Sequence, residues 1–268
     1  MQDITNSAID IHDLTGQSIV KSYSSAVISS ANFISLQDIH YTQYDKFGNV
    51  LTENIKTYTD EAATVLQDYK EIVNHYKDDV TAKRGNADIS TVSRWTSADH
   101  LDSQYIDKTV TTTTLFDLQG RAVDQVQETS VYNGTTLELA SHNEIVNINY
   151  DNRGDAAEQH ITSYKVIDGA FDSTSVLVDY KVMTNRTYDA SHNIVNQMVC
   201  TYSDPQSDMS APLDVEEIRS IGITPSGMAL KEIIVTYPTP PSRYDFLGIV
   251  GHVLSSPPIR PHCPKDQE

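Results

Sequence analysis

A turn motif recurs along this chain and limits what it can fold into. The motif consists of an aromatic residue, an aspartate, two variable residues and a glycine, and its four clearest copies read YDKFGN, FDLQGR, YDNRGD and YDASHN. An aspartate that opens a turn accepts hydrogen bonds from backbone N–H groups two residues on, and glycine supplies the positive φ that such a turn requires. The motif therefore predicts a tight turn between two strands at each copy.

An aspartate and a glycine, or a substitute for the glycine, should shape each of these turns. The residues concerned are Asp45, Gly48, Asp117, Gly120, Asp151, Gly154, Asp189 and Asn193. In the fourth copy His192 occupies the glycine position. We expect the neighbouring Asn193 to supply the positive φ there, because asparagine adopts that conformation more readily than most residues.

The glycines recur at a nearly constant distance. With Gly16, Gly48, Gly85, Gly120, Gly154, His192 and Gly227 as anchors, the successive spacings are 32, 37, 35, 34, 38 and 35 residues. Apolar residues recur three and seven residues after most anchors, as Leu51 and Ile55 or Val195 and Val199 do. Positions four apart share one face of a strand, so these residues are expected to face a common core. A period of about 35 residues is typical of a repeat array.

Each period predicts a strand, a tight turn, a second strand and a looser polar connection. A single hairpin is marginally stable in water, so neighbouring units must pair to share a core. We expect an all-β fold in which antiparallel β-hairpin repeats of about 35 residues form an extended, curled or partly closed sheet or shell. This array should occupy residues 1–237, and the proline-rich stretch 238–268 should form a mobile tail.

The charge of the chain argues against several classes of partner. Its 19 Lys and Arg residues against 37 Asp and Glu residues give 19 − 37 = −18. Nucleic-acid binding requires a basic surface, and anionic lipid attracts basic segments, so neither partner is expected. No apolar run approaches the roughly 18 residues of a membrane-spanning helix, so membrane insertion is not expected either.

No motif specifies a reaction or a cofactor. P-loop, HExxH, GxSxG and Gly-rich dinucleotide-binding motifs are absent, and the nine histidines form no i,i+4 pair that a helix could use. We therefore predict no catalytic residue, no cofactor and no metal ligand.

Aromatic residues lie ten positions after five of the anchors, and two interpretations of them stay open. They are Tyr58, Trp95, Tyr164, Tyr202 and Tyr237. In a stacked array they would form a column, which is more typical of a structural cross-strand ladder. The same column could also present rings on which a glycan stacks.

Two metal-binding alternatives are weaker than the structural interpretation. In the third turn, oxygen ligands for calcium could come from Asn149, Asp151 and Asp155, but an aspartate that caps its own turn explains the same pattern. Near the C-terminus, a metal could be ligated by His252, His262 and Cys263.

The four turn motifs resemble the YD repeat (Tyr-Asp-x-x-Gly-Asn/Arg) of rearrangement-hotspot proteins and of very large repeat-rich bacterial surface proteins. The resemblance covers roughly residues 10–237. It implies β-hairpins that wind into a long sheet, sometimes closing into a hollow shell, in a protein that is secreted or held at the cell surface. The period is longer here than in the compact family repeat. The Asp-Pro-x-Gly self-cleavage motif of toxin-encapsulating members is absent, and only Asp204-Pro205 followed by QSD occurs.

These observations predict a non-enzymatic repeat segment of an extracellular or cell-surface bacterial protein that provides a β-sheet scaffold. Its main partners would be other repeats of the same or a longer chain. The N-terminus lacks the features of a signal peptide, so we expect the chain to be a piece of a longer protein. One alternative is an adhesion module that binds polysaccharide or another cell surface. A further alternative is a wall segment of a toxin-encapsulating shell.

Overall fold

Fourteen strands make up most of the described part of the chain. The computed structural model describes residues 1–190, 192–207, 209, 211–223 and 229–237. The strands are β1 (Gln2–Ser7), β2 (Gln17–Tyr23), β3 (Phe33–Tyr44), β4 (Val50–Tyr58), β5 (Leu66–His75), β6 (Ile89–Trp95), β7 (Tyr105–Phe116), β8 (Ala122–Tyr132), β9 (Leu137–Tyr150), β10 (Ala156–Lys165), β11 (Val176–Tyr188), β12 (Ile194–Tyr202), β13 (Asp214–Ile223) and β14 (Ala229–Tyr237). Helical structure is limited to α1 (Asp79–Lys83), η1 (Ser30–Asn32) and η2 (Asp102–Gln104) within the described residues.

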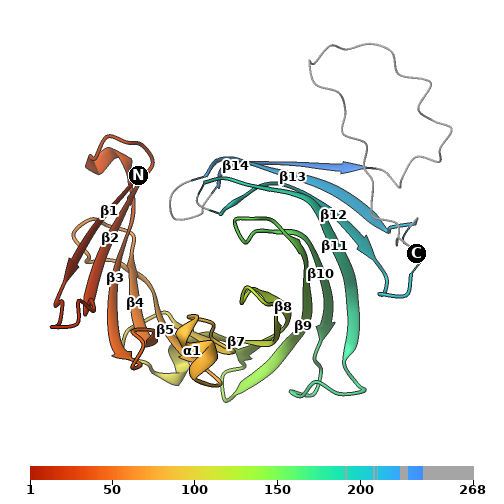
Figure 1. Ribbon diagram of the computed structural model, residues 1–268, viewed down its shortest axis with the longest axis horizontal. Helices are drawn as coiled ribbons and strands as arrows, with labels where there is room; N and C mark the ends of the chain where they lie inside the picture. Colours follow the sequence, from red (N-terminus) through yellow and green to blue (C-terminus); the bar gives the residue numbers. More distant parts are fainter. Residues whose placement is uncertain (191, 208, 210, 224–228, 238–268) are drawn as a thin grey trace, which may run out of the picture. The chain divides into compact units, whose positions relative to one another are not determined.

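The strands form one antiparallel sheet in which each strand lies beside the next one in the sequence (Figure 1). The order runs from β1 to β14 without a crossover, and β1 and β14 are the two ends of an open sheet. Successive strands can pair in this way because short turns and moderate connections join them. The all-β class and the antiparallel hairpins expected from the sequence are confirmed.

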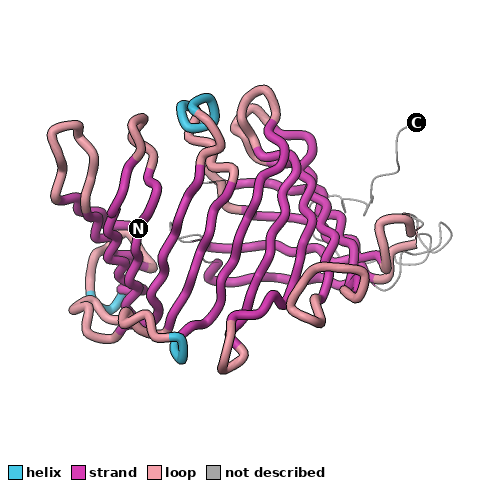
Figure 2. The backbone as a smooth tube through the Cα atoms, turned by 90° about the horizontal axis from the view of Figure 1, so that it is seen from below, coloured by secondary structure: helices cyan, strands magenta, loops and turns pink. Residues whose placement is uncertain are grey.

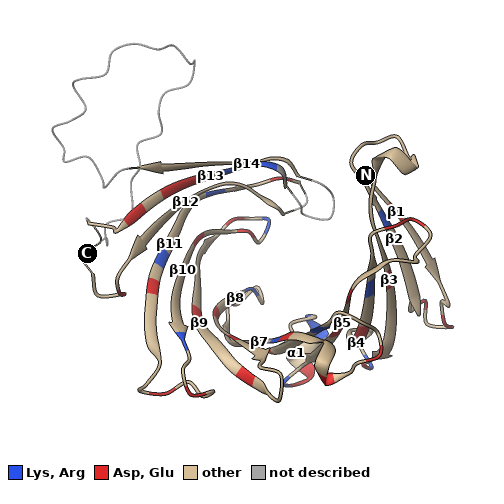
Figure 3. Ribbon diagram, turned by 180° about the vertical axis from the view of Figure 1, so that it is seen from behind, with Lys and Arg blue, Asp and Glu red and all other residues tan. Residues whose placement is uncertain are grey.

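Contacts within the chain divide it into two compact units. Unit 1 comprises Met1–Val146, Tyr164–Val176 and Ile223–Met228, and unit 2 comprises Asn147–Ser163, Leu177–Gly222 and Ala229–Glu268. The expected tail at 238–268 and the turn at Gly227 lie outside the described residues, as do the three candidate metal ligands near the C-terminus. Asp and Glu residues are spread over strands and connections of each unit (Figure 3).

Two hairpins in unit 1, β3–β4 and β7–β8, depart from regular pairing close to the turn, where each strand has one residue without a partner in the register. Thr42 in β3 and Thr114 in β7 interrupt the regular pairing with β4 and β8. Their hydroxyl groups donate to the backbone carbonyls of Thr52 and Asp124, at 3.1 Å and 3.2 Å. Such bulges increase the local twist of a strand pair. Figure 2 shows the long strands of the sheet side by side and the turns gathered at their ends.

The apolar cluster described in unit 2 lies on the face that carries Tyr202. It consists of Tyr180, Val182, Met198, Cys200, Tyr202 and Val215. In β12, Met198 and Cys200 alternate with Val199, so Val195 and Val199 point to the opposite face. Val199 is buried, as expected of a core position, whereas Val195 on the same face is only half-buried.

In unit 1, aromatic side chains from three neighbouring strands pack against one another. Trp95 on β6 is paired with Tyr69 on β5 and Tyr105 on β7, and its ring lies 5.8 Å and 4.6 Å from theirs. Tyr69 and Trp95 are buried, whereas Leu51 and Ile55 are only half-buried. Aromatic side chains thus contribute to the buried core of unit 1 together with aliphatic ones such as Val20 and Leu36, whereas the two aliphatic positions expected from the sequence are less buried.

Helix α1 takes the place of the tight turn between β5 and β6. Asp78 caps it, because its carboxylate accepts from the N–H groups of Val80 and Thr81 at 2.9 Å each. The Thr81 hydroxyl completes a capping box with the backbone of Asp78. No helix in the described residues has the length and apolar character needed to span a membrane.

Candidate functional site

The first complete turn motif closes around the carboxylate of Asp45. Its Oδ1 accepts from the backbone N–H groups of Phe47 and Asn49, at 2.8 Å and 2.9 Å, and its Oδ2 accepts from the Asn49 side chain at 2.8 Å. Gly48 has φ +87°. Burial alone would raise the pKa of Asp45, but hydrogen bonds from the Asn49 side chain and from backbone N–H groups outweigh it and lower the pKa.

The second and third motifs have the same geometry. Asp117 accepts from the N–H groups of Gln119 and Arg121, both at 2.9 Å, and Gly120 has φ +86°. Arg121 occupies the position of Asn49, and its Nε donates to Asp117 Oδ2 at 2.6 Å.

Asp151 in turn accepts from the N–H groups of Arg153 and Asp155, at 2.8 Å and 2.9 Å, and Gly154 has φ +89°. The hydrogen bond from Asp155 is the main reason why the pKa of Asp151 is lowered. The carboxylate therefore acts as the cap of its own turn.

The fourth turn corrects one expectation from the sequence. The positive φ, +64°, belongs to His192 and not to Asn193. Asn193 instead occupies the position of Asn49, and its N–H and side-chain amide donate to the Asp189 carboxylate, each at 3.0 Å. The physical reason is the fixed spacing of the turn, because the residue three positions after the aspartate must reverse the chain whatever its identity.

Adjacent turns in unit 1 are bonded to one another. The Tyr44 hydroxyl donates to the carbonyl of Thr15 in the preceding turn at 2.5 Å. The Asn49 side-chain amide donates to the carbonyl of Ala82 in α1, in the following hairpin, at 2.6 Å. Lys46 forms an ion pair of 2.7 Å with Asp79. We call this continuous row of turns, residues 8–16, 45–49 and 77–86, the turn rim.

Unit 2 contains a corresponding contact between its two YD turns. The Arg153 guanidinium donates to the backbone carbonyl of Asp189. The Asp155 carboxylate lies 2.7 Å from Nδ1 of the His192 ring, within hydrogen-bond distance. The Tyr188 hydroxyl donates to the carbonyl of Ala156 at 2.7 Å. The aromatic residue of the motif thus has a second role, since in Tyr44 and Tyr188 its hydroxyl reaches the backbone of the preceding hairpin.

The same contacts bear on the calcium alternative. Asp151 is a turn cap, and Asp155 is engaged by His192 and by Arg153, the latter at 3.4 Å. Within the described residues, no group of three or more His, Cys, Asp and Glu side chains is placed to hold a metal ion. The geometry around Asn149 therefore gives the calcium hypothesis no support.

The five aromatic residues considered for glycan stacking do not form a common exposed surface. Trp95 and Tyr202 are only 7% and 1% exposed. Tyr58, Tyr164 and Tyr237 are half-buried. Among the described ring contacts none joins two of the five, because intervening strands supply other rings such as Tyr69 and Tyr180.

Two of these aromatic side chains, Trp95 and Tyr164, instead contact the long connections that follow them. The connection after β6 returns so that His100 stacks on Trp95, with ring centroids 4.8 Å apart. The connection after β10 brings Phe171 to 5.0 Å from Tyr164 and 3.7 Å from the buried ring of His142. Each ring is therefore covered by the connection that follows it in the chain.

A hydroxyl residue directly after the aromatic closes three of these connections, a feature that the sequence analysis missed. Ser24, Thr59 and Thr96 each donate their N–H to the carbonyl at the end of the connection, at 2.7 Å, 3.0 Å and 2.9 Å. Their hydroxyl groups point to the same carbonyls. The dipeptides Tyr-Ser, Tyr-Thr and Trp-Thr were the available signal.

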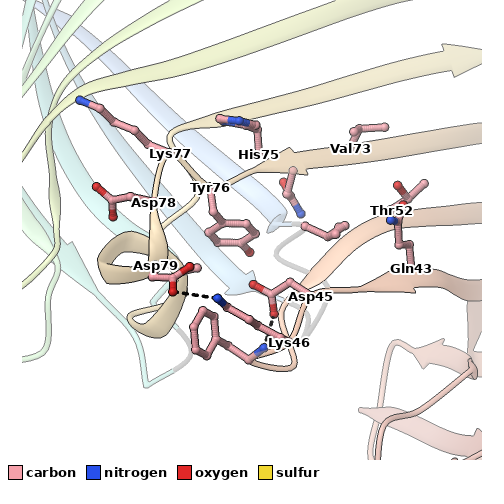
Figure 4. Close-up of a pocket in the computed structure, with 14 residues that line it drawn as sticks. Gln43, Asp45, Lys46, Thr52, Val73, His75, Tyr76, Lys77, Asp78 and Asp79 are labelled. Carbon is pink, nitrogen blue, oxygen red and sulfur yellow. Dashed lines mark hydrogen bonds and ion pairs between the residues drawn. The ribbon is translucent and has the colours of Figure 1, made fainter.

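An open pocket of about 640 Å³ lies beside the turn rim in unit 1 (Figure 4). It is lined by Gln43, Asp45, Lys46, Phe47, Leu51, Thr52, Val73, Asn74, His75, Tyr76, Lys77, Asp78, Asp79 and Ala82. The Tyr76 side chain follows β5 and projects into the space near Asp45 and Lys46. Of these residues, the sequence analysis had singled out Asp45 as a turn residue and Leu51 as a core residue, and it predicted no pocket.

Comparison with known proteins leaves the chain without an assigned family. No protein-family model matches it, and no curated protein matches it. Its function is therefore inferred from the contacts within the chain.

Proposed function

We propose that this chain is a structural repeat segment, without enzymatic activity, whose hairpins build a β-sheet scaffold one unit at a time. The observation that carries this proposal is the bonding between successive turns. Tyr44 reaches the turn before its own, and Asn49 reaches the one after it. A unit so bonded to both neighbours depends on them for stability and supports them in return.

The internal geometry of the motif supports the same function. The Asp carboxylates of the four turns accept hydrogen bonds from their own backbone, and the aromatic side chains hold their own connections. These polar and aromatic groups, which could otherwise serve a reaction or a ligand, are thereby occupied by folding. This arrangement favours a scaffold over the aromatic column as a glycan-binding surface.

Removal of one whole unit tests the proposal. Deletion of residues 59–95 joins Tyr58 to Thr96, and Thr96 would then close its connection as Thr59 does in the intact chain. The shortened chain should keep the circular dichroism of a β-sheet and a cooperative unfolding transition, because equivalent strands remain adjacent.

Deletion of a single strand is the matched control. Loss of residues 77–95 removes α1 and β6, so the connection at 96–104 would join β5 directly to β7, two strands that run in the same direction, and the alternation of turns and connections is lost. This variant should lose the cooperative transition. Equal behaviour of the two deletions, whether both fold or both unfold, would refute a scaffold built from modular units.

The resemblance to YD-repeat proteins leads us to propose an extracellular or cell-surface location in a bacterium. The acidic composition, with a formal charge of −18, is compatible with a solvated surface of that kind. Digestion of intact source cells with an external protease should remove the chain while cytoplasmic proteins persist. Protection in intact cells and release only on lysis would contradict this location.

A further inference from the structure

The tip of the β8–β9 hairpin joins an asparagine to a glycine. Asn133 and Gly134 are both exposed, and they lie between β8, which ends at Tyr132, and β9, which begins at Leu137. An asparagine side chain is open to attack by the backbone nitrogen of the residue that follows it. Glycine hinders this attack least, because it has no Cβ atom beside that nitrogen. The dipeptide Asn-Gly occurs at this one position of the sequence.

The turn holds the side-chain amide of Asn133 in the way that an oxyanion site holds a reacting carbonyl. Its Oδ1 accepts from the backbone N–H groups of Thr135 and Thr136, at 2.9 Å each. Two backbone donors on one oxygen stabilise the negative charge that develops there when a nucleophile adds to the carbonyl carbon. The backbone N–H of Asn133 donates to the carbonyl of Thr136 at 3.0 Å, which fixes the same turn.

The nucleophile and the leaving group of such a reaction are both free. Among the described residues, neither the backbone N–H of Gly134 nor the side-chain NH₂ of Asn133 has a hydrogen-bond partner. Gly134 has φ +95°, and a Cβ atom placed on it would meet no atom within 4 Å. The glycine is therefore accessible, and no bond has to be broken before its nitrogen reacts.

We propose that Asn133 is a site of spontaneous deamidation, a modification that the turn promotes and that the scaffold does not require. The Gly134 nitrogen forms a bond to Cγ of Asn133, and the bond from Cγ to the amide nitrogen breaks. The proton of the Gly134 nitrogen passes through solvent to the leaving group, which departs as ammonia. The product is a succinimide ring. Water then adds to either ring carbonyl and opens the ring, which gives an aspartate or an isoaspartate.

Asn49 and Asn193 provide a contrast within the same chain. Each precedes a β-branched residue, Val50 or Ile194, whose side chain crowds the backbone nitrogen. The side-chain NH₂ of each also donates to the aspartate of its own turn, at 2.8 Å from Asn49 and 3.0 Å from Asn193. These two amides are held as parts of their turns, so they should persist where Asn133 reacts.

The two products should affect the hairpin differently. An aspartate would accept the same two backbone N–H groups with a full negative charge, as Asp45 and Asp117 do in their own turns. An isoaspartate adds one methylene group to the main chain beside Gly134. The pairing of Tyr132 with Leu137 next to the turn would then be strained.

Incubation of the full chain in heavy-oxygen water at mildly alkaline pH tests the inference. Proteolysis and tandem mass spectrometry should find Asn133 converted, with one oxygen atom taken from the solvent. Conversion should be severalfold faster at Asn133 than at Asn49 or Asn193. It should also be severalfold faster in the native chain than in the chain unfolded by guanidinium chloride, because only the folded turn supplies two N–H donors to Oδ1.

Asn133→Gln is the matched control, since glutamine keeps the amide but has to close a larger ring, which forms more slowly. This variant should lose the conversion and keep the circular dichroism of the native chain, because Asn133 is exposed. Asn133→Asp identifies the aspartate product in chromatography. An intact Asn133 after incubation would overturn the inference. So would faster conversion at Asn49 or Asn193, or a rate in the native chain that does not exceed the rate in the unfolded chain. Each of these results leaves the scaffold intact, since the scaffold is judged by the deletion variants.

Discussion

The side-chain amide of Asn49 donates a 2.6 Å hydrogen bond to the backbone carbonyl of Ala82, 33 residues further along the chain. The same amide donates to Asp45 Oδ2 at 2.8 Å within its own turn. A single residue thus closes one turn and ties it to the next hairpin. This double role explains how a local motif can propagate order along a sheet.

Replacement of Asn49 tests how much the hydrogen bond between the two hairpins contributes to the stability of the protein. Asn49→Ala is expected to lower the free energy of unfolding by about 1–3 kcal/mol, because the Ala82 carbonyl and Asp45 both lose a donor. Urea denaturation followed by circular dichroism measures the change. Asn193→Ala is the control, since among the described residues the hydrogen bonds of the Asn193 side chain go to Asp189 of its own turn. An equal or larger loss for Asn193→Ala would argue against an added contribution from the bond between turns.

Gly48 should tolerate few substitutions. Its φ of +87° is costly for a residue with a Cβ atom, although the nearest atom to such a Cβ, Leu14 Cδ2 at 3.5 Å, is in ordinary contact. Gly48→Ala is therefore expected to cost about 1 kcal/mol of stability through backbone conformation alone. Gly48→Asn should cost less in the same denaturation experiment. A larger loss for asparagine than for alanine would show that crowding, and not φ, limits this position.

The connection between β10 and β11 should depend on one aromatic contact. Phe171 lies parallel to the His142 ring at 3.7 Å, with an interplanar angle of 2°, and contacts Tyr164 from the edge. Phe171→Ala should increase amide hydrogen exchange and protease cleavage within residues 166–175, because the connection loses its anchor. Ile167→Ala provides the comparison, since Ile167 is 57% exposed in the same connection. Similar effects of both substitutions would exclude a specific anchoring role for Phe171.

Glu53 should make the protein less stable at neutral pH than at acidic pH. Burial raises the pKa of its carboxyl, and it forms no ion pair within the described residues. A folded-state pKa above the unfolded value of about 4.3 favours the protonated form in the folded state, so stability is lost as pH rises through this region. Glu53→Gln should therefore stabilise the protein at pH 7 and have little effect near pH 3. Thermal unfolding of both proteins at the two pH values checks this, and a pH-independent difference would contradict it.

The turns could be predicted from local sequence because their chemistry is local. Asp45 and Gly48 lie three residues apart, and the hydrogen bonds and the positive φ that they provide need no distant partner. The fourth turn shows the limit of this reasoning. The identity of Asn193 suggested the positive φ, whereas position in the turn assigned it to His192.

Residues whose roles depend on neighbouring hairpins were harder to predict. Tyr76 and Gln43 belong to different hairpins, and nothing in their local sequence shows that they line one pocket. The aromatic column also looked continuous in the sequence, but Tyr69 lies beside Trp95 and the two are buried together. Pairing between strands decides which rings meet.

By itself, the sequence determined the all-β class, the hairpins and the aspartate-capped turns, because alternation and turn chemistry act over a few residues. Only the tertiary structure decided which face is buried, how Asn49 joins two hairpins and where Tyr76 lines a pocket. Those features depend on side chains brought together from distant positions, and their contacts are fixed by strand register and by the return of the connections over the sheet.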